Sequence, residues 1–200
     1  EPTIQAFCVP IVYLDRDTRS LVEDTYGLTV TTVVVKPQSR GEVRLRSANP
    51  ADKPLVSPNL LKDPADMAAM IAGQRFFVRA FQTGPLAERV KRIAIPDPAA
   101  LDDATLAQHC RRFVKTNYHP ASTARMGADG DPMAVLDARM RVRGIEGLRV
   151  ADMSAVPDIN AGNTNAPAMM LGDRCAAFAP QKNSTGWCCG GELRRYSQKT

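Results

Sequence analysis

The sequence predicts an α+β fold with a mainly antiparallel sheet and flanking helices. Residues 28–36 are rich in β-branched side chains, which is typical of a strand. Residues 42–47 follow a short turn and alternate polar with apolar side chains, which indicates a half-buried antiparallel neighbour. Residues 63–81 then repeat apolar side chains at helical spacing behind an Asp-Pro start.

Three strands are expected in the first quarter of the chain. Residues 7–14 form a mostly apolar run, and residues 28–36 are the clearest strand. A turn at residues 39–41 predicts that residues 28–36 pair with residues 42–47. In the second of these strands, Val43 and Leu45 are expected to face the core and Arg44 and Arg46 the solvent.

The first helix has clear start signals. Asp63 can cap it, Pro64 fits the first helical position, and Asp66 suits the positive end of the helix dipole. Its apolar stripe is interpreted as core packing and consists of Met67, Met70, Ile71, Phe77, Val78 and Phe81.

Two further helices are expected, at residues 102–115 and 167–178. In the first, His109 and Arg112 are expected on the wetter faces. Its inward side is expected to consist of Leu106, Cys110, Phe113 and Val114. Short extended pieces at 134–137, 140–142 and 148–152 separate the two helices.

Composition excludes several classes of protein. The net charge is +5, and residues 181–200 alone contribute four basic side chains against Glu192. No basic stripe with interleaved aromatics appears, so nucleic-acid binding is not expected. No apolar run approaches the length of a transmembrane segment. Residues 180–200 lack periodicity and are interpreted as a disordered or non-native tail.

The cysteines indicate neither a disulfide framework nor a metal site. There are five, an odd number, with no Cys-x-x-Cys pair and no zinc-like spacing to histidine. Cys8, Cys110 and Cys175 are interpreted as buried thiols in a reducing compartment. This favours a cytoplasmic protein, although the sequence does not establish its location.

His119 is the candidate for chemistry. It lies in the run 117–127 (Asn-Tyr-His-Pro-Ala-Ser-Thr-Ala-Arg-Met-Gly), and the run 162–170 (Gly-Asn-Thr-Asn-Ala-Pro-Ala-Met-Met) follows. Taken alone, a single loop histidine is usually structural, and an Asn-rich run with glycine is usually a turn. The pair of runs, in this order and at this spacing, resembles the glucose-methanol-choline (GMC) family of flavin-dependent alcohol oxidoreductases.

Other segments extend the resemblance in family order. Residues 36–45 resemble the family's Pro-x-Ser-Arg-Gly-x-Val-x-Leu strand pair, and residues 49–59 and 147–154 also match. The similarity covers residues 1–179, and the choline-dehydrogenase-like and alcohol dehydrogenase subgroup looks most similar. It implies three regions: the end of the substrate-binding region (1–35), a GMC C-terminal domain (36–179), and the tail (180–200).

Two small departures and one large one accompany the resemblance. Ser122 stands where the family loop usually has glycine, and Ala124 where it often has cysteine; the loop is expected to keep its path. No Gly-x-Gly-x-x-Gly loop follows a strand, although an FAD-binding half should contain one. A C-terminal strand–helix segment is therefore expected to complete an FAD-binding domain that is absent here.

The resemblance implies oxidation of an alcohol CH–OH group by hydride transfer to FAD. Histidine titrates near neutral pH, so the family role of base falls on His119. Asn163 matches the second active-site position, and its amide could donate to the substrate oxygen. The FAD contacts implied by the resemblance are Asp152, Met153, Asn163, Thr164, Asn165, Ala166 and Pro167.

Alternatives remain at this point. Asp152 could simply cap a turn, and Asn165 and Pro167 could be ordinary helix-start residues. The chain could also be a truncated, non-catalytic fragment or binding domain that lacks the FAD-binding half. The expected partners are a small-molecule alcohol, an electron acceptor that could be oxygen, a quinone or a protein, and the N-terminal FAD domain.

Overall fold

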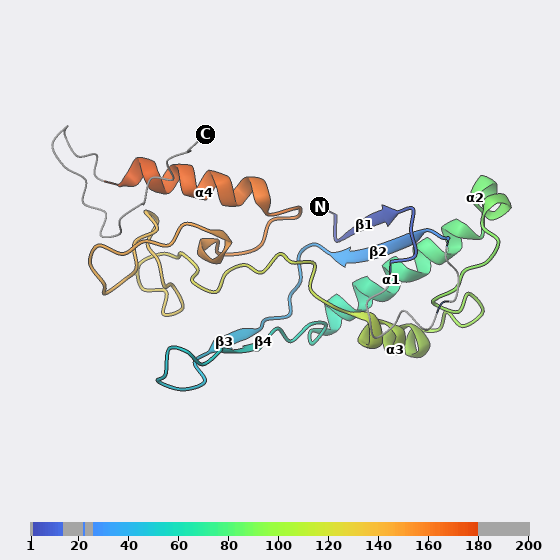
Figure 1. The fold of residues 1–200 in the computed structure, drawn as a ribbon, viewed down its shortest axis with the longest axis horizontal. Helices are drawn as coiled ribbons and strands as arrows, with labels where there is room; N and C mark the ends of the chain where they lie inside the picture. The colour runs from blue at the N-terminus through green and yellow to red at the C-terminus, as the bar shows by residue number, and fades with distance from the viewer. Residues whose placement is uncertain (1, 14–21, 23–25, 180–200) are drawn as a thin grey trace, which may run out of the picture.

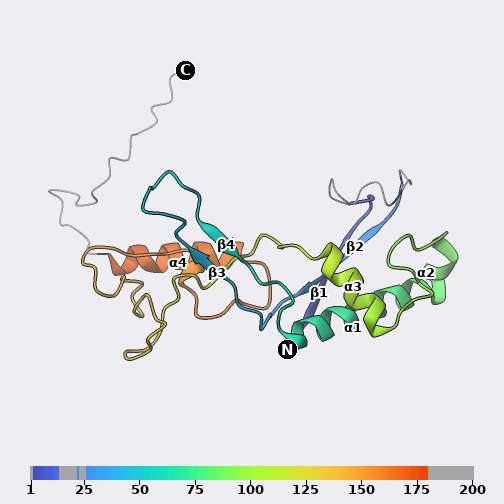
Figure 2. The same ribbon diagram turned by 90° about the horizontal axis from the view of Figure 1, so that it is seen from below.

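The computed structural model describes residues 2–13, 22 and 26–179, which form two groups of elements (Figure 1). One group contains strands β1 (Ile4–Val9) and β2 (Thr29–Val34) with helices α1 (Pro64–Phe81), α2 (Gly84–Arg89) and α3 (Asp103–Phe113). The other contains helix α4 (Asn165–Phe178) with the long loops before it. The view from below also places the two groups at opposite ends of the molecule (Figure 2). Helices combined with small antiparallel sheets confirm the α+β prediction.

The first sheet pairs β1 (Ile4–Val9) with β2 (Thr29–Val34) in antiparallel register, so that Ile4 faces Val34 and Val9 faces Thr29. The strand predicted at residues 28–36 is thus confirmed. The strand predicted at 7–14 instead begins at Ile4 and ends at Val9, since Pro10 lacks the N–H that would continue the ladder. Leu14 lies outside the described residues.

The predicted pairing of residues 28–36 with 42–47 is wrong. Strand β3 (Glu42–Arg44) pairs instead with β4 (Leu55–Ser57), as a separate two-stranded ribbon. The intervening residues do not form a tight hairpin. Gly41 lies against the backbone of Ser57 and Pro58, where an added Cβ would come within 2.4 Å of the Ser57 carbonyl oxygen. This close contact brings the chain beside β4 and away from β2.

The prediction that Val43 and Leu45 face the core is also wrong. Val43 is 51% exposed and Leu45 is 86% exposed, because the β3–β4 ribbon packs against no other strand or helix among the described residues. A two-residue alternation predicts a strand, but it does not show that another element covers the apolar face.

Helix α1 (Pro64–Phe81) begins as predicted, with the Asp63 carboxylate accepting a hydrogen bond from the Ala65 N–H at 2.8 Å. Ile71 and Val78 of the predicted stripe are buried. The helix lies along the β1–β2 sheet (Figure 1). Gly73 allows this close approach, since a Cβ there would lie 2.6 Å from the Thr32 methyl group.

Helix α2 is short (Gly84–Arg89), and helix α3 (Asp103–Phe113) packs on α1. The Asp102 carboxylate caps α3 by accepting from the Thr105 N–H at 3.0 Å. The core between α1 and α3 is formed by Ile71, Leu106, Ala107 and Cys110.

His109 is a partial correction, because its ring is half-buried on α3 and does not lie on a wet face. The ring stacks at 4.6 Å between centroids on Phe113. Burial, together with the nearby Arg112 charge, lowers the pKa of His109 below its usual value. Arg112 is exposed, as predicted.

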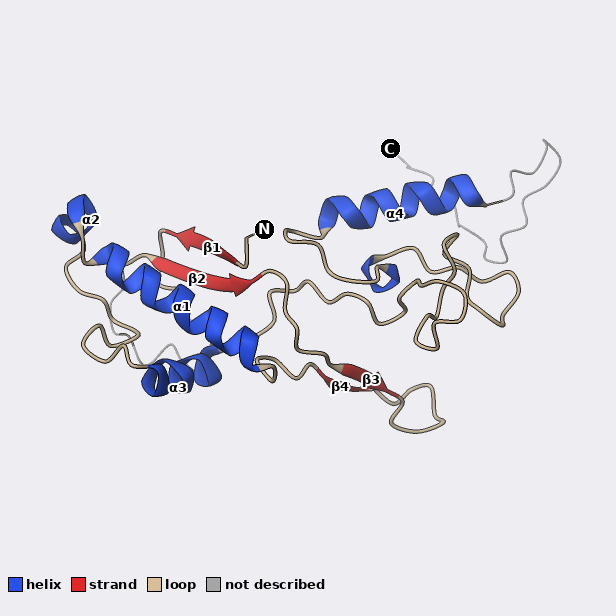
Figure 3. Cartoon of the chain, turned by 180° about the vertical axis from the view of Figure 1, so that it is seen from behind, coloured by secondary structure: helices blue, strands red, loops and turns tan. Residues whose placement is uncertain are grey.

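Loops dominate the region between α3 and α4 (Figure 3). Isolated bridges join Met126 to Leu136, Leu136 to Val142, and Arg141 to Arg149, and Leu136 is fully buried among them. Helix α4 (Asn165–Phe178) begins two residues earlier than predicted. Pro167 is therefore its third residue, a position at which the missing N–H breaks no intrahelical hydrogen bond.

The cysteine prediction is right for Cys110, which is buried, and wrong for Cys8, which is exposed; Cys175 is half-buried. Cys8 is the penultimate residue of β1, at the end of the strand that leads into residues 10–13. The predicted tail, including Cys188 and Cys189, lies outside the described residues. Within the described ranges, no helix is long and apolar enough to cross a membrane, and no three His, Cys, Asp or Glu side chains cluster as metal ligands.

Candidate functional site

The His119 loop begins directly after α3. Tyr118 adopts a left-handed backbone with φ of 61°, which turns the chain immediately before His119. The His119 ring is half-buried, and its Nδ1 lies 3.4 Å from the Asn117 side-chain nitrogen. Among the described residues this is the only hydrogen-bond contact of the ring.

The orientation of the Asn117 amide decides which ring nitrogen of His119 can act as a base. With the amide nitrogen at Nδ1, that nitrogen accepts and Nε2 holds the proton in the neutral ring. Rotating the amide by half a turn places its oxygen at Nδ1, which then donates and leaves Nε2 free to accept a proton. A base at Nε2 requires the second arrangement.

The strand-like segment after His119 is anchored to the segment that contains Asp152. Ser122, Ala124 and Met126 donate backbone hydrogen bonds to the carbonyls of Met153, Ser154 and Ala155, at 3.0, 3.0 and 2.9 Å. The ladder starts at Ser122, whose φ is 69°. This left-handed conformation is the one that favours glycine, and it is adopted by the serine that replaces the family's usual glycine. The loop therefore carries some backbone strain at Ser122; that it follows the path of the family's loop stays a prediction.

Asp152 caps the short 3₁₀ turn η2 (Met153–Ala155). Its carboxylate accepts from the Ser154 N–H at 2.8 Å and from the Ser154 hydroxyl at 2.5 Å. These two bonds outweigh partial burial and lower the pKa of Asp152 below its usual value. The side chain is exposed, so one carboxylate oxygen still faces outward while the other caps the turn.

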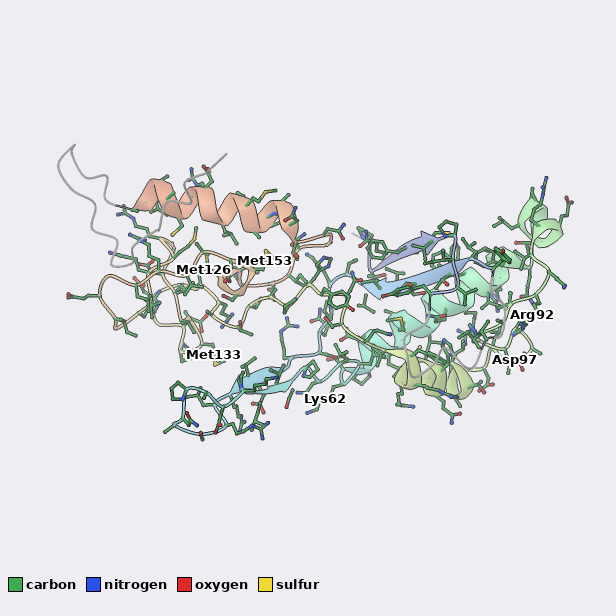
Figure 4. All side chains as sticks on the ribbon, viewed as in Figure 1. Lys62, Arg92, Asp97, Met126, Met133 and Met153 are labelled. Atoms are coloured by element: carbon green, nitrogen blue, oxygen red, sulfur yellow. The ribbon has the colours of Figure 1, made fainter. Side chains whose placement is uncertain are left out.

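A buried cluster joins the His119 loop, the Asp152 segment and α4. Met140, Met153 and Leu171 form its centre. Figure 4 shows Met126 and Met153 side by side beneath α4. Around them pack Ala121, Met126, Ala151, Val156, Ala168, Cys175 and Phe178. The three segments singled out in the sequence therefore belong to one packed unit.

Asn163 lies at the end of a turn that leads into α4. Its side chain is exposed, and its carbonyl oxygen accepts from the Asn160 amide nitrogen at 3.3 Å. Thr164, the next residue, is 9% exposed. No hydrogen bond joins the side chains of His119 and Asn163 in the described part of the chain. The segments that contain His119 and Asn163 pack against the same core, but the two side chains are not hydrogen-bonded to each other.

The start of α4 is open. Thr164 is its N-cap residue, but its side chain makes no capping hydrogen bond. Asn165 and Ala166 are exposed, and Pro167 is half-buried in the first turn. A helix start of this kind presents unpaired N–H groups and about half a positive charge. An anionic or electron-rich group would be stabilised there.

Two residues that the sequence analysis missed also shape this region. Asn160 donates to the turn before Asn163, and its Oδ1 atom is buried without a hydrogen-bond donor among the described residues. Arg125 forms an ion pair with Asp131 at 2.8 Å, which joins the two ends of the loop at residues 125–131. An Asn three residues before a helix-start motif is a weak signal, because such residues are common in turns.

The polar groups of this region make few bonds with one another, which leaves them available to a cofactor. An unpaired buried acceptor and an uncapped helix start are both groups that normally find a partner. The ring of a flavin offers carbonyl oxygens, which could accept from the free N–H groups at the start of α4. Two hollows, of about 460 and 390 Å³, lie along α1, and His119 lines neither of them.

Comparison with known proteins establishes the family. The C-terminal model of the GMC oxidoreductase family matches residues 37–172. The chain therefore belongs to the GMC oxidoreductase family, as its C-terminal domain. Homologues and solved structures of this family are FAD-dependent.

Two curated relatives and one solved structure illustrate the similarity. An alcohol dehydrogenase [acceptor] of Pseudomonas putida is 38% identical over 90% of this chain and 32% of its own length. Choline oxidase of Arthrobacter globiformis is 42% identical over 75% of this chain and 28% of its own length. A formate oxidase of Aspergillus oryzae RIB40 matches with a TM-score of 0.71 and 29% identity, over 78% of this chain and 27% of that one. The chain thus spans about a third of the length of the curated relatives it matches.

Proposed function

We propose that this chain is the C-terminal part of an FAD-dependent oxidoreductase that oxidises the CH–OH group of a small alcohol. The observation that supports this most is the packing of the His119 loop, the Asp152 segment and α4 into one unit. These are the segments that, in family order, supply the base, a cofactor contact and the helix start. Alcohol oxidation needs a proton removed from oxygen and a hydride removed from carbon.

His119 is the proposed base. Its ring is held by the loop that begins at Tyr118, and the ladder from Ser122 to Met126 fixes that loop to η2. In the arrangement with Nδ1–H donating to the Asn117 amide oxygen, Nε2 can take the hydroxyl proton of the substrate. FAD, when bound, accepts the hydride.

Asn163 is the proposed second active-site residue. Its exposed amide can donate a hydrogen bond to the substrate oxygen as negative charge develops there. Because an amide does not titrate, its contribution is independent of pH near neutrality. It would orient the alcohol while His119 removes the proton.

The proposed FAD contacts follow from the open start of α4 and from η2. The N–H groups of Asn165 and Ala166, with Thr164 and Pro167 beside them, would stabilise negative charge on a flavin. The Asp152 carboxylate oxygen that does not cap η2 would accept a hydrogen bond from FAD. The buried Met153 side chain would hold this segment in the core.

The proposal extends to the regions of the chain and to its partners. Residues 36–179 would form the GMC C-terminal domain, residues 1–35 the end of the substrate-binding region, and residues 180–200 a tail. An N-terminal FAD-binding part would complete the site. The electron acceptor would be oxygen, a quinone or a protein.

Replacing the proposed base tests this function. In the full-length protein that contains this chain, His119→Asn keeps a polar side chain of similar size but removes the base. We expect kcat to fall by about 10²- to 10⁴-fold, the range that general-base catalysis contributes, with FAD content unchanged. The chain has only one other histidine, so His109→Gln is the matched control and should retain activity. Equal turnover of His119→Asn and the parent protein would rule out the base role.

A further inference from the structure

Asn160 is bonded to the peptide groups on both sides of Gly162. Its side-chain nitrogen donates to the Gly162 carbonyl at 3.1 Å and to the Asn163 carbonyl at 3.3 Å. Its own backbone carbonyl accepts from the Gly162 N–H at 2.9 Å. Three hydrogen bonds from one residue therefore define the turn that presents Asn163.

Gly162 does not itself fix the shape of this turn. A Cβ built at Gly162 would meet the Asn160 amide nitrogen at 3.6 Å, an ordinary contact, and no other atom within 4 Å. Gly162 is not among the described glycines with positive φ. The turn therefore does not depend on the left-handed freedom of glycine at Gly162. The amide of Asn160 supplies two of the three hydrogen bonds that hold it.

The orientation of the Asn160 amide follows from its partners. Two carbonyl oxygens face the nitrogen, so the flipped amide would set three oxygens against one another. With the nitrogen in place, Oδ1 is buried and has no donor among the described residues. A buried acceptor without a partner is costly. The unpaired Oδ1 atom offsets part of the stability that the two donated bonds provide, so stability alone does not explain an asparagine here.

We infer that Asn160 is a positioning residue for the reaction proposed above, acting through Asn163. By holding the Gly162 and Asn163 carbonyls, it fixes the direction in which the Asn163 side chain leaves the backbone and the entry of the chain into α4. This inference rests on the proposed function, because it gives Asn163 a substrate oxygen to orient. Asn160 itself contacts no reacting atom.

Substitutions at Asn160 separate positioning from general stability. In the full-length protein, Asn160→Ala removes the donor and should lower kcat about tenfold, with KM and FAD content nearly unchanged. Asn160→Thr retains a hydroxyl donor and should restore most of the rate. Asn160→Asp places a carboxylate against two carbonyl oxygens and should not. Asp158→Ala is the control in the same segment, since its ion pair with Arg40 is exposed and contributes little.

A double variant tests whether Asn160 acts through Asn163. Asn163→Ala alone should lower kcat by about 10²-fold, as the loss of one donor to a developing oxyanion does. Adding Asn160→Ala to it should lower kcat no further, because coupled residues are not additive. Multiplied losses in the double variant would overturn the inference.

Hydrogen exchange tests whether Asn160 holds the turn, separately from the proposed role of Asn163 in the reaction. Asn160→Ala should speed exchange in the peptide spanning residues 161–166, and Asn160→Thr should not. If Asn163→Ala leaves turnover unchanged, the proposed role of Asn163 fails, even where exchange shows that Asn160 holds the turn. Unchanged exchange in Asn160→Ala would overturn the positioning role itself.

Discussion

Ser122 adopts a strained backbone conformation in the loop after His119. Its φ of 69° lies in the left-handed region, and its N–H begins the ladder to Met153. A non-glycine residue pays about 1–2 kcal/mol for this conformation. Glycine would adopt this backbone conformation without that cost.

Replacing Ser122 with glycine should therefore stabilise the protein. Relief of the left-handed strain is partly offset by about 0.5–1 kcal/mol from the greater freedom of glycine when unfolded. We expect the free energy of unfolding to rise by up to about 1 kcal/mol, measured by denaturant titration. Thr123→Gly, at the next position and without positive φ, should lower it. A loss of stability in Ser122→Gly would contradict the strain argument.

The junction between α1 and the segment before β3 depends on a buried carboxylate. Asp66 is 3% exposed and accepts from the Gln38 and Ser39 N–H groups at 2.8 Å each. Burial opposes its ionisation, but hydrogen bonds from the Ser39 hydroxyl and from these two N–H groups prevail and lower its pKa. The first turn of α1 thus holds the segment that leads to β3.

This junction should be sensitive to acid. A lowered folded-state pKa stabilises the protein above the unfolded value of about 3.9, and that contribution is lost as the pH falls through the lower folded value. We expect the Gln38 and Ser39 amides to be protected from exchange at pH 7, after correction for the intrinsic rate, and to lose protection in strong acid.

Asp66→Asn is the variant that tests this dependence. It should lose protection at Gln38 and Ser39 already at pH 7, because an amide offers only one acceptor oxygen. Asp173→Asn, an exposed substitution on α4, should follow the parent protein at every pH. Protection that persists unchanged in Asp66→Asn would show that the carboxylate does not hold the junction.

At the scale of the whole molecule, the group around α4 leaves apolar side chains uncovered. Met169 is 63% exposed and Met170 is 54% exposed on α4, and Ile145 and Leu148 are 55% and 47% exposed on the loops before it. The sequence analysis predicted that a C-terminal strand–helix segment completes an FAD-binding domain, and α4 belongs to that segment. Large exposed apolar side chains of this kind favour self-association of a chain that stands alone.

The isolated 200-residue chain should therefore self-associate and should not retain FAD. Size-exclusion chromatography is expected to show oligomers, and the protein should be colourless after purification with added FAD. Met169→Gln combined with Met170→Gln should raise the monomer fraction. Phe76→Gln, at a similar exposure of 65% on α1, should not. A yellow, monomeric chain would show that it needs no further part to hold the cofactor.

The resemblance and the local signals in the sequence predicted much of this protein. Capping by Asp63, the apolar stripe of α1 and the β-branched strand at 28–36 depend on neighbours within a few residues, and the structure confirms all three. The family assignment rested on two short runs around His119 and Asn163, and the family comparison confirms it. The roles of those residues stay predictions.

Long-range contacts account for what the sequence analysis missed. The pairing of β2 with β1, the exposure of Leu45, the burial of Asp66 and the bonds of Asn160 depend on contacts between distant residues or on fine backbone geometry. Periodicity reports which side of an element is apolar, but not what covers that side. The sequence by itself determined the α+β class, the helix starts and the family. Only the tertiary structure decided strand partners, burial and which segments share one core, because these depend on packing between residues far apart in the chain.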